Sequence, residues 1–255
     1  MSGFRIYLWA ECAKLRRCRM LAVFVFGALL VVLLVLVQGG LNGSGVSYLA
    51  EPYWVLTGVQ SLGSIFALPA LVALLGGYLF CRERQEDVWK SLLVLPADTR
   101  WMTLAKLALT LAGSAGLYLL LFLAALCIEA VLHGGALAAG DLLSYLRMYA
   151  TEGVLVFCAV LPVVAWVARR GRGYWLAMVL SEAFSVLVPL ISGAGLPACL
   201  HPLVAAFTLA GYYPGGPAHC GLSAAVLAVC LGAGAALLSA QENLDCTQGA
   251  APPPG

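Results

Sequence analysis

Residues 20–37 of this chain read MLAVFVFGALLVVLLVLV, an apolar run without one charged side chain. A helix needs about 20 such residues to cross the hydrocarbon core of a bilayer. Five further stretches have the required length and apolar character, namely residues 61–80, 104–126, 151–168, 174–191 and 221–240. They must be helical, because open strands or irregular segments would leave N–H and C=O groups unpaired in lipid. The sequence therefore predicts an all-α integral membrane protein with six transmembrane helices.

The composition of the whole chain supports this fold class. Among 255 residues, 62% are hydrophobic and 10% are charged, and the mean hydropathy is +0.96. Soluble domains carry about 25% charged residues, so this chain has too few charges to cover a surface in water. The net charge of +2 gives no reason to expect a nucleic acid partner. The partner that we expect around the chain is the lipid bilayer.

The cations divide very unevenly between the two sides of the predicted membrane domain. Thirteen of the 14 Lys and Arg residues precede the first span, join the second to the third, or join the fourth to the fifth. Only Arg147 falls in a loop on the other side. Cytoplasmic loops are the ones that membrane proteins enrich in Lys and Arg. We therefore expect a multi-pass protein of the cell membrane with both termini in the cytoplasm.

The segments outside the spans have patterns of their own. Residues 1–19 mix aromatic rings with cations at roughly helical spacing, which is typical of an amphipathic helix in the cytoplasmic interface. Residues 20–240 then form one six-span domain, whose first span is a retained helix rather than a cleaved signal peptide. Residues 194–218, rich in Gly and Pro, predict an outer re-entrant segment between the fifth and sixth spans. Residues 241–255 are expected to be a short, disordered cytoplasmic tail.

The loop between the second and third spans is the most charged part of the chain. Residues 81–103 read CRERQEDVWKSLLVLPADTRWMT. Residues 83–95 can form a short amphipathic helix, because Glu86 stands four residues before Lys90 and Trp89 joins several leucines on an apolar side. Such a helix could lie on the membrane surface, or it could receive a cytoplasmic partner.

Several motifs for chemistry are missing from the sequence. It has no G-x-x-x-x-G-K-[ST] loop for ATP, no H-E-x-x-H pair and no G-x-S-x-G nucleophile motif. The nine cysteines include no C-x-x-C pair, so we expect neither a metal nor a cofactor on this chain. Cys199 and Cys220 could be apolar fillers or a disulfide of the outer segment. The three histidines are expected to be interfacial residues near the outer ends of the spans rather than ligands: His133, His201 and His219.

Glu182 lies well inside the fifth predicted span, about 12 Å along the helix from Tyr174. An ionised, unpaired carboxyl near the bilayer centre costs several kcal/mol, so Glu182 should face protein or water, or be protonated. Together with Ser181 and Ser185 it could line a substrate path for cationic or amphipathic cargo, or it could hydrogen-bond a neighbouring helix. Glu152, expected near the outer end of the fourth span where water is close, is a weaker candidate for the same path.

These segments together resemble the permeases of type-2 ABC (ABC-2) exporters. Residues 10–20, AECAKLRRCRM, run straight into the first span, and the second span ends in a charged stretch. Within that superfamily the chain resembles permeases of lantibiotic-immunity or bacteriocin-resistance transporters, which share a Glu…Trp-Lys…Leu-Pro…Lys-Leu pattern. In this sequence the pattern falls on Glu83 or Glu86, Trp89, Lys90, Leu95, Pro96, Lys106 and Leu107.

The resemblance implies a permease that pairs with a second copy or a sister subunit in a bacterial plasma membrane. Two separate ABC ATPase subunits, which carry ATP and Mg, would dock at the cytoplasmic face, so this chain would not be an enzyme itself. The cargo would be an antimicrobial peptide, as in lantibiotic or bacteriocin self-immunity, or another amphipathic compound. The coupling helix that the ATPases move would carry Glu83, Glu86, Asp87, Trp89 and Lys90.

Other classes of function stay open at this point. A proton-coupled secondary transporter would use Glu182 as its proton site and would need no ATPase, although the inverted repeats common in such carriers are not evident. An intramembrane enzyme would use Glu182 or Glu152 as a base or a metal ligand, although no second ligand clusters with either. A scaffold without transport activity is a further alternative.

Overall fold

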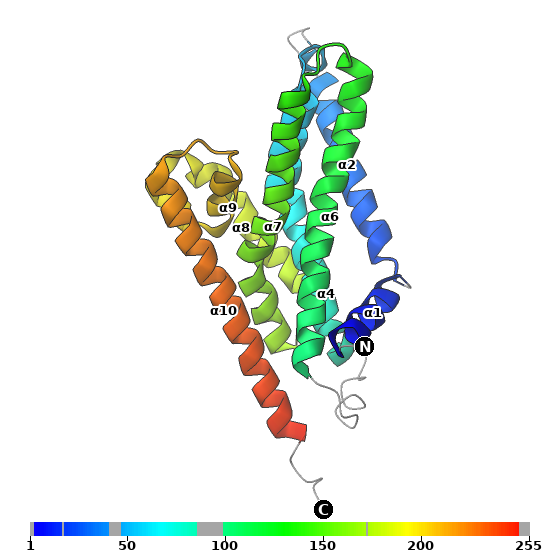
Figure 1. The fold of residues 1–255 in the computed structure, drawn as a ribbon, viewed down its shortest axis with the longest axis vertical. Helices are drawn as coiled ribbons and strands as arrows, with labels where there is room; N and C mark the ends of the chain where they lie inside the picture. Colours follow the sequence, from blue (N-terminus) through cyan, green and yellow to red (C-terminus); the bar gives the residue numbers. More distant parts are fainter. Residues whose placement is uncertain (1–2, 17, 41–46, 86–98, 172, 250–255) are drawn as a thin grey trace, which may run out of the picture.

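The computed structural model describes residues 3–16, 18–40, 47–85, 99–171 and 173–249. These residues are almost entirely helical, and no strand occurs among them. Six of the helices are long and apolar enough to cross a membrane, which confirms the predicted all-α membrane fold. They run side by side along the long axis of the molecule (Figure 1).

The helices that form the spans extend beyond most of the apolar runs that predicted them. They are α2 (Met20–Gly40), the continuous unit of α3 (Trp54–Val59), η2 (Gln60–Ala67) and α4 (Leu68–Gln85), then α6 (Thr99–His133), α7 (Ala139–Arg170), α8 (Trp175–Ile191) and α10 (Pro217–Gly249). At a rise of 1.5 Å per residue, α6 is about 50 Å long, against about 30 Å for a hydrocarbon core. The longer helices therefore extend past the membrane, where apolar residues are no longer required and the hydropathy signal ends.

The unit formed by α3, η2 and α4, here called the central rod, lies at the middle of the bundle. Of the residues in its most apolar stretch, 83% are buried, against 22% in α8 and in α10. The rod contacts α2, α6, α7 and α8. Its middle segment, η2, is π-helical rather than α-helical, which widens the helix and changes the direction of the side chains that follow.

The shorter helices lie at the ends of the spans. The amphipathic helix predicted in residues 1–19 is α1 (Gly3–Arg16), which lies across the lower ends of α4 and α6 (Figure 1). At the opposite end, η1 (Tyr48–Ala50) leads into the central rod. The lower end also holds the C-terminal part of α10 (Figure 1).

A compact, broken helical segment separates α8 from α10, as the Gly and Pro pattern predicts. It consists of η3 (Ser192–Ala194), η4 (Leu196–Leu200) and α9 (Pro202–Ala210). Gly195 (φ 71) and Gly211 (φ 92) turn the chain on either side of it with backbone angles that residues with a Cβ rarely adopt. Because α9 packs against α7 and α10 and its apolar residues are buried, the segment is part of the bundle and not a free loop. Cys199 of η4 and Cys220 of α10 are both free thiols, so the possible disulfide between them is not formed.

The C-terminal segment differs from its prediction. A disordered tail was expected from residue 241, but α10 continues as a helix to Gly249. The mostly polar residues 241–248 stop the apolar run without stopping the helix, because none of them is a Gly or Pro that would disfavour helix. Residues 250–255 lie outside the described residues.

A close approach of α6 and α7 depends on Gly153. A Cβ added to Gly153 would stand 3.0 Å from the Cα of Ala115 and 3.2 Å from the Cβ of Tyr118. The same contact includes a hydrogen bond of 2.6 Å from Ser114 Oγ to the carbonyl oxygen of Gly153. Small residues permit this kind of backbone contact between membrane helices.

Gly153→Ala is therefore expected to destabilise the protein by about 1–3 kcal/mol, because the backbone of α6 would have to move. Gly116 of α6 provides the control, since no atom lies within 4 Å of its added Cβ and Gly116→Ala should leave stability unchanged or raise it slightly. Thermal unfolding in detergent compares the two variants. Equal melting temperatures would contradict the packing role of Gly153.

Candidate functional site

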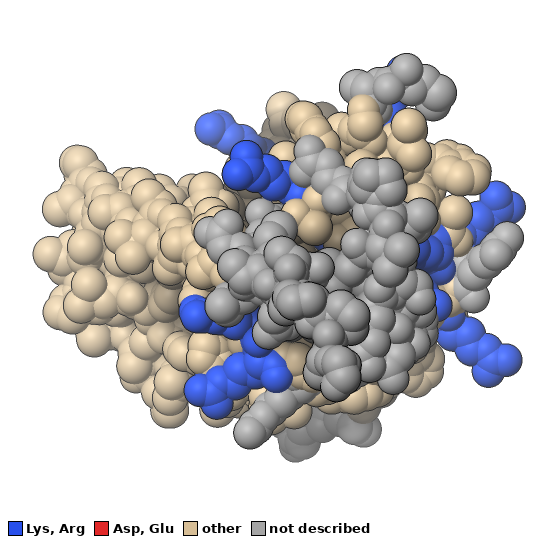
Figure 2. All heavy atoms as spheres, turned by 90° about the horizontal axis from the view of Figure 1, so that it is seen from below, with Lys and Arg blue, Asp and Glu red and all other residues tan. Residues whose placement is uncertain are grey.

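Apart from Arg147 near the start of α7, the described Lys and Arg side chains gather at the end of the bundle where α1 lies (Figure 2). We call this the basic end. The cations come from α1, from the end of α4, from the start of α6 and from the end of α7. Helices that are far apart in the sequence therefore present positive charge on one face.

A buried ion network lies inside the basic end. It consists of Glu11 and Lys14 of α1, Glu83 of α4 and Lys106 of α6, and we call it the Glu83 cluster. Lys106 Nζ lies 2.6 Å from Glu83 Oε2. Lys14 Nζ lies 2.7 Å from Glu83 Oε1 and 2.7 Å from Glu11 Oε1.

Pairing is what makes the burial of these charges possible. Glu11, Glu83 and Lys106 are all buried, and an unpaired charge at such a position would cost several kcal/mol. Lys106 Nζ also lies 5.7 Å from the centroid of the Phe80 ring, a favourable cation–π position. Burial lowers the pKa of Lys14, but its hydrogen bonds to Glu11 and Glu83 outweigh that effect and raise the pKa above its usual value.

The position of Glu83 corrects one expectation. The sequence placed Glu83 on a helix that faces a cytoplasmic partner, whereas its side chain is buried between α1 and α6. The reason is that α4 continues to Gln85, so Glu83 belongs to the packed end of a span. The other predicted coupling residues lie in residues 86–98, outside the described residues: Glu86, Asp87, Trp89 and Lys90. The Glu83 cluster thus stands at the base of that loop and joins the helices on both sides of it.

Glu152 is also deeper than expected. The sequence placed it near the outer end of a span, but α7 begins at Ala139, so Glu152 stands about 20 Å into the helix and is completely buried. Gln60 Nε2 donates a hydrogen bond of 2.6 Å to Glu152 Oε1. Glu152 Oε2 and Ser64 Oγ have no hydrogen-bond partner in the described part of the chain.

The surroundings of Glu152 are formed by the π-helical segment of the central rod. Gln60 and Ser64 both belong to η2. Tyr118 of α6 donates a hydrogen bond of 3.1 Å to the carbonyl oxygen of Ser64, and Tyr149 of α7 donates one of 2.9 Å to that of Leu56. We call Gln60, Ser64, Tyr118, Tyr149 and Glu152 the Glu152 cluster. It joins the middle of the rod to α6 and α7 at a segment type that is frequent at functional sites.

Glu182 faces different surroundings from the other two candidate residues of α8, Ser181 and Ser185, because consecutive helical residues are about 100° apart and residues four apart share a face. Ser185 is buried and donates a hydrogen bond of 3.0 Å to the carbonyl oxygen of Ser181. Ser181 is buried too, and it lines a cavity between α7, α8, α9 and α10. Glu182 is only partly buried, and no described residue forms an ion pair or hydrogen bond with it. Glu152 and Glu182 are therefore not joined into one polar site by any described contact.

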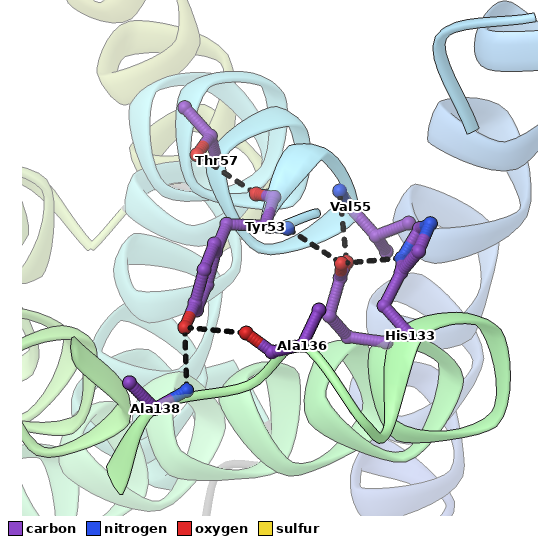
Figure 3. A network of polar contacts seen from close by, with 7 residues as sticks. Tyr53, Val55, Thr57, His133, Ala136 and Ala138 are labelled. Carbon is purple, nitrogen blue, oxygen red and sulfur yellow. Dashed lines mark hydrogen bonds and ion pairs between the residues drawn. The ribbon is translucent and has the colours of Figure 1, made fainter. Parts of the chain in front are cut away.

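A further buried carboxylate, besides Glu11, was not predicted. Glu129 of α6 is completely buried at the end opposite to the basic end. Its Oε1 accepts a hydrogen bond of 2.6 Å from Tyr53 N, its Oε2 accepts one of 3.1 Å from Val55 N, and Oε1 also lies 2.9 Å from His133 Nδ1 (Figure 3). These two amides are at the start of α3, so the carboxylate caps that helix from another span.

Tyr53 completes this arrangement, which we call the Glu129 cluster. It holds a left-handed backbone (φ 66), and its hydroxyl accepts a hydrogen bond of 2.7 Å from Ala138 N at the turn between α6 and α7 (Figure 3). His133, expected near the outer end of its span, lies at the end of α6 and is paired with Glu129. The sequence contained one indication of this cluster, because Glu129 and His133 stand four residues apart just after the third predicted span. Nothing near them in the sequence indicates that Glu129 also binds the amides of Tyr53 and Val55.

Comparison with known proteins identifies the chain's relatives at the family level. The family described as ABC-2 family transporter protein matches residues 7–188, which is well over half of the chain. The matched region contains the Glu83, Glu152 and Glu129 clusters, whereas α9 and α10 lie beyond it. Searches of curated proteins and of solved structures find no match.

Lys106→Met tests the Glu83 cluster. The substitution leaves Glu83 buried with one of its two cations removed, and we expect a loss of about 3–5 kcal/mol in the free energy of unfolding. Arg169→Met is the control, since Arg169 is exposed at the same end and should change stability by less than about 0.5 kcal/mol. The double variant E83Q/K106M should lose less than the sum of the single losses. Additive losses, measured by thermal unfolding in detergent, would contradict a coupled pair.

Glu129→Ala tests the cap on the central rod. Without the carboxylate, the amides of Tyr53 and Val55 lose their acceptors, and loss of a cap costs about 0.5–2 kcal/mol. Hydrogen–deuterium exchange of the peptide that covers the start of α3 should therefore become several-fold faster. Glu51→Ala removes an exposed carboxyl close by and should leave this exchange unchanged. The same rate in both variants would mean that Glu129 does not hold the start of α3.

Proposed function

Because this chain belongs to the ABC-2 family of transporter proteins, we propose that it is the membrane-spanning permease subunit of an ATP-driven exporter. The observation that supports this most strongly is the Glu83 cluster. It ties α1, α4 and α6 together at the base of the loop between the second and third spans. A force applied to that loop would therefore move three helices as one unit.

The central rod provides a route from the loop to the rest of the membrane domain. α4 is continuous with η2 and α3, so displacement at the basic end is passed along a single helical element. The rod is held at its middle by the Glu152 cluster and at its far end by the Glu129 cluster. Alternating access would then follow from movement of this rod with α6 and α7 relative to α8 and α10.

In this proposal ATP is bound and hydrolysed, with Mg, on two separate ABC ATPase subunits. They dock on the loop that contains Glu86, Asp87, Trp89 and Lys90. The basic end faces the cytoplasm, since Lys and Arg are enriched on that side of membrane proteins. The membrane is the plasma membrane of a bacterium.

A second permease, either another copy or a sister subunit, packs against α8. One side of that helix exposes four large apolar side chains, Trp175, Val179, Val186 and Leu190. The partly exposed Glu182 lies among them. A carboxyl at this depth is costly in lipid, and a protein or water-filled surface opposite α8 removes the cost. Glu182 then lines the path between the two permeases and favours cargo with a cationic group. An antimicrobial peptide, as in lantibiotic or bacteriocin self-immunity, has this chemistry, as do other amphipathic compounds.

The second candidate function is a proton-coupled secondary transporter. It is favoured by one observation, namely that Glu182 has no charged or hydrogen-bonding partner among the described residues. The two functions differ in whether a nucleotide-hydrolysing subunit is needed.

Isolation of the tagged protein from its native membrane in mild detergent, followed by mass spectrometry, distinguishes them. We expect a P-loop ATPase to be recovered in stoichiometric amount. The variant E86K/D87K should reduce that recovery about tenfold or more, because reversed charges at a docking site repel the partner, and it should uncouple transport from ATP hydrolysis. Glu51→Lys, a charge reversal at the opposite end, should have no such effect.

One outcome would contradict the exporter, and a second would contradict only the docking site proposed for its ATPase. Repeated absence of any ATPase from intact, monodisperse protein would favour the proton-coupled carrier and make Glu182→Gln the next variant. Unchanged recovery and transport in E86K/D87K would place ATPase docking elsewhere than on this loop.

A further inference from the structure

A cavity of about 130 Å³ lies between α7, α8, α9 and α10. It is separate from the three carboxylate clusters, and two of its four walls come from helices beyond the region that matches the ABC-2 family. Its lining includes residues of α7, of α8, of the junction between η4 and α9, and of α10: Val160, Val163, Ser181, Phe184, His201 and Cys230.

The lining combines apolar walls with polar atoms that lack partners. Ser181 is only 2% exposed, and its Oγ has no hydrogen-bond partner among the residues that the structure describes. Both ring nitrogens of His201 are also buried, and neither has a hydrogen-bond partner among the described residues. Buried polar groups are nearly always satisfied in native proteins, so each unsatisfied group requires an explanation. Two such residues on one cavity indicate a ligand that supplies the missing hydrogen bonds.

The size and charge of the cavity limit what that ligand can be. A cavity of about 150 Å³ accommodates a benzene molecule, so this one fits a single ring or a short alkyl segment. No Asp, Glu, Lys or Arg lines it, which favours an uncharged ligand. The Phe184 ring, whose centroid lies 5.8 Å from that of His201, offers an aromatic wall beside the imidazole.

We propose that this cavity binds an uncharged, ring-sized molecule that carries one hydroxyl group, such as a phenol, with Ser181 and His201 as its hydrogen-bond partners. The hydroxyl can donate to an imidazole nitrogen and accept from the serine hydroxyl. The ring occupies the apolar part between α7, α8 and α10. A bound molecule therefore connects α8 to the broken segment before α10. This binding requires neither ATP nor a second permease.

Cys230 provides a direct probe of occupancy, because its side chain lines the cavity and is partly exposed. The purified protein in phosphatidylcholine nanodiscs is labelled with N-ethylmaleimide, and mass spectrometry follows each cysteine separately. Phenol should slow the labelling of Cys230 in a saturable manner. Toluene, which has the same ring without the hydroxyl, should require a concentration about five-fold higher or more, since one hydrogen bond is missing. Cys220, which does not line the cavity, should react at an unchanged rate.

Matched serine variants test the hydrogen bond. Ser181→Ala should weaken protection by phenol about five-fold and leave protection by toluene unchanged. Ser185→Ala is the control, because Ser185 is also buried on α8 but bonds to the carbonyl oxygen of Ser181 and does not line the cavity. Ala159→Leu, which adds volume to the wall, should abolish protection by both probes while Cys220 still reports an intact fold.

Three results would overturn the proposal. Absence of saturable protection by phenol would mean that the cavity holds water alone. Equal protection by phenol and toluene would remove the role of the polar pair. Equal effects of S181A and S185A would indicate a general change in α8 rather than a lost contact with the ligand. None of these results bears on ATPase recovery, so the proposed exporter function is tested independently.

Discussion

A carboxylate that is removed from water must find its partners inside the protein, and this requirement organises the described part of the molecule. It is met at three levels of the bundle. Lys14 and Lys106 neutralise Glu83 at the basic end, Gln60 donates to Glu152 in the middle, and the backbone amides of α3 together with His133 satisfy Glu129 at the far end. The central rod takes part in every one of these clusters. Its position against α6 and α7 is therefore determined at both ends and between them.

This arrangement divides the membrane domain into two regions that differ in the contacts holding their helices together. The central rod, α6 and α7 are joined by buried polar contacts as well as by apolar packing. α8 and α10 have few buried residues, and Glu182 of α8 is left without a described partner. Membrane helices gain little from apolar burial alone, because lipid tails solvate apolar surface equally well. The polar clusters thus mark where the chain's own residues hold the bundle together, whereas α8 and α10 leave most of their side chains uncovered by this chain.

The candidate site residues show which features of a site can be predicted from neighbouring residues in the sequence and which cannot. The cations of α1 and the charged end of α4 could be recognised as charged flanks of the spans from the order of residues alone. Their arrangement as a buried network could not, since Glu83 was expected to face outward. Ser181 and Ser185 were predicted together with Glu182 as one path, but helical rotation turns the serines towards the protein and leaves Glu182 at the edge. The position of His201 on a cavity could not be predicted from the sequence, because the cavity walls come from four different helices.

The sequence by itself determined the number of spans, the end at which cations gather and the broken segment before the last helix. Each of these depends on the properties of consecutive residues: about 20 apolar side chains for a span, Lys and Arg between spans, and Gly or Pro where the backbone turns. Only the tertiary structure decided which carboxylates are buried and what neutralises them. The bonds involved join residues that are 23, 69, 76 and 92 positions apart. Burial and partners at such separations result from the way whole helices pack. Even the charged stretch that contains both Glu83 and Lys106 does not show that the two side chains pair.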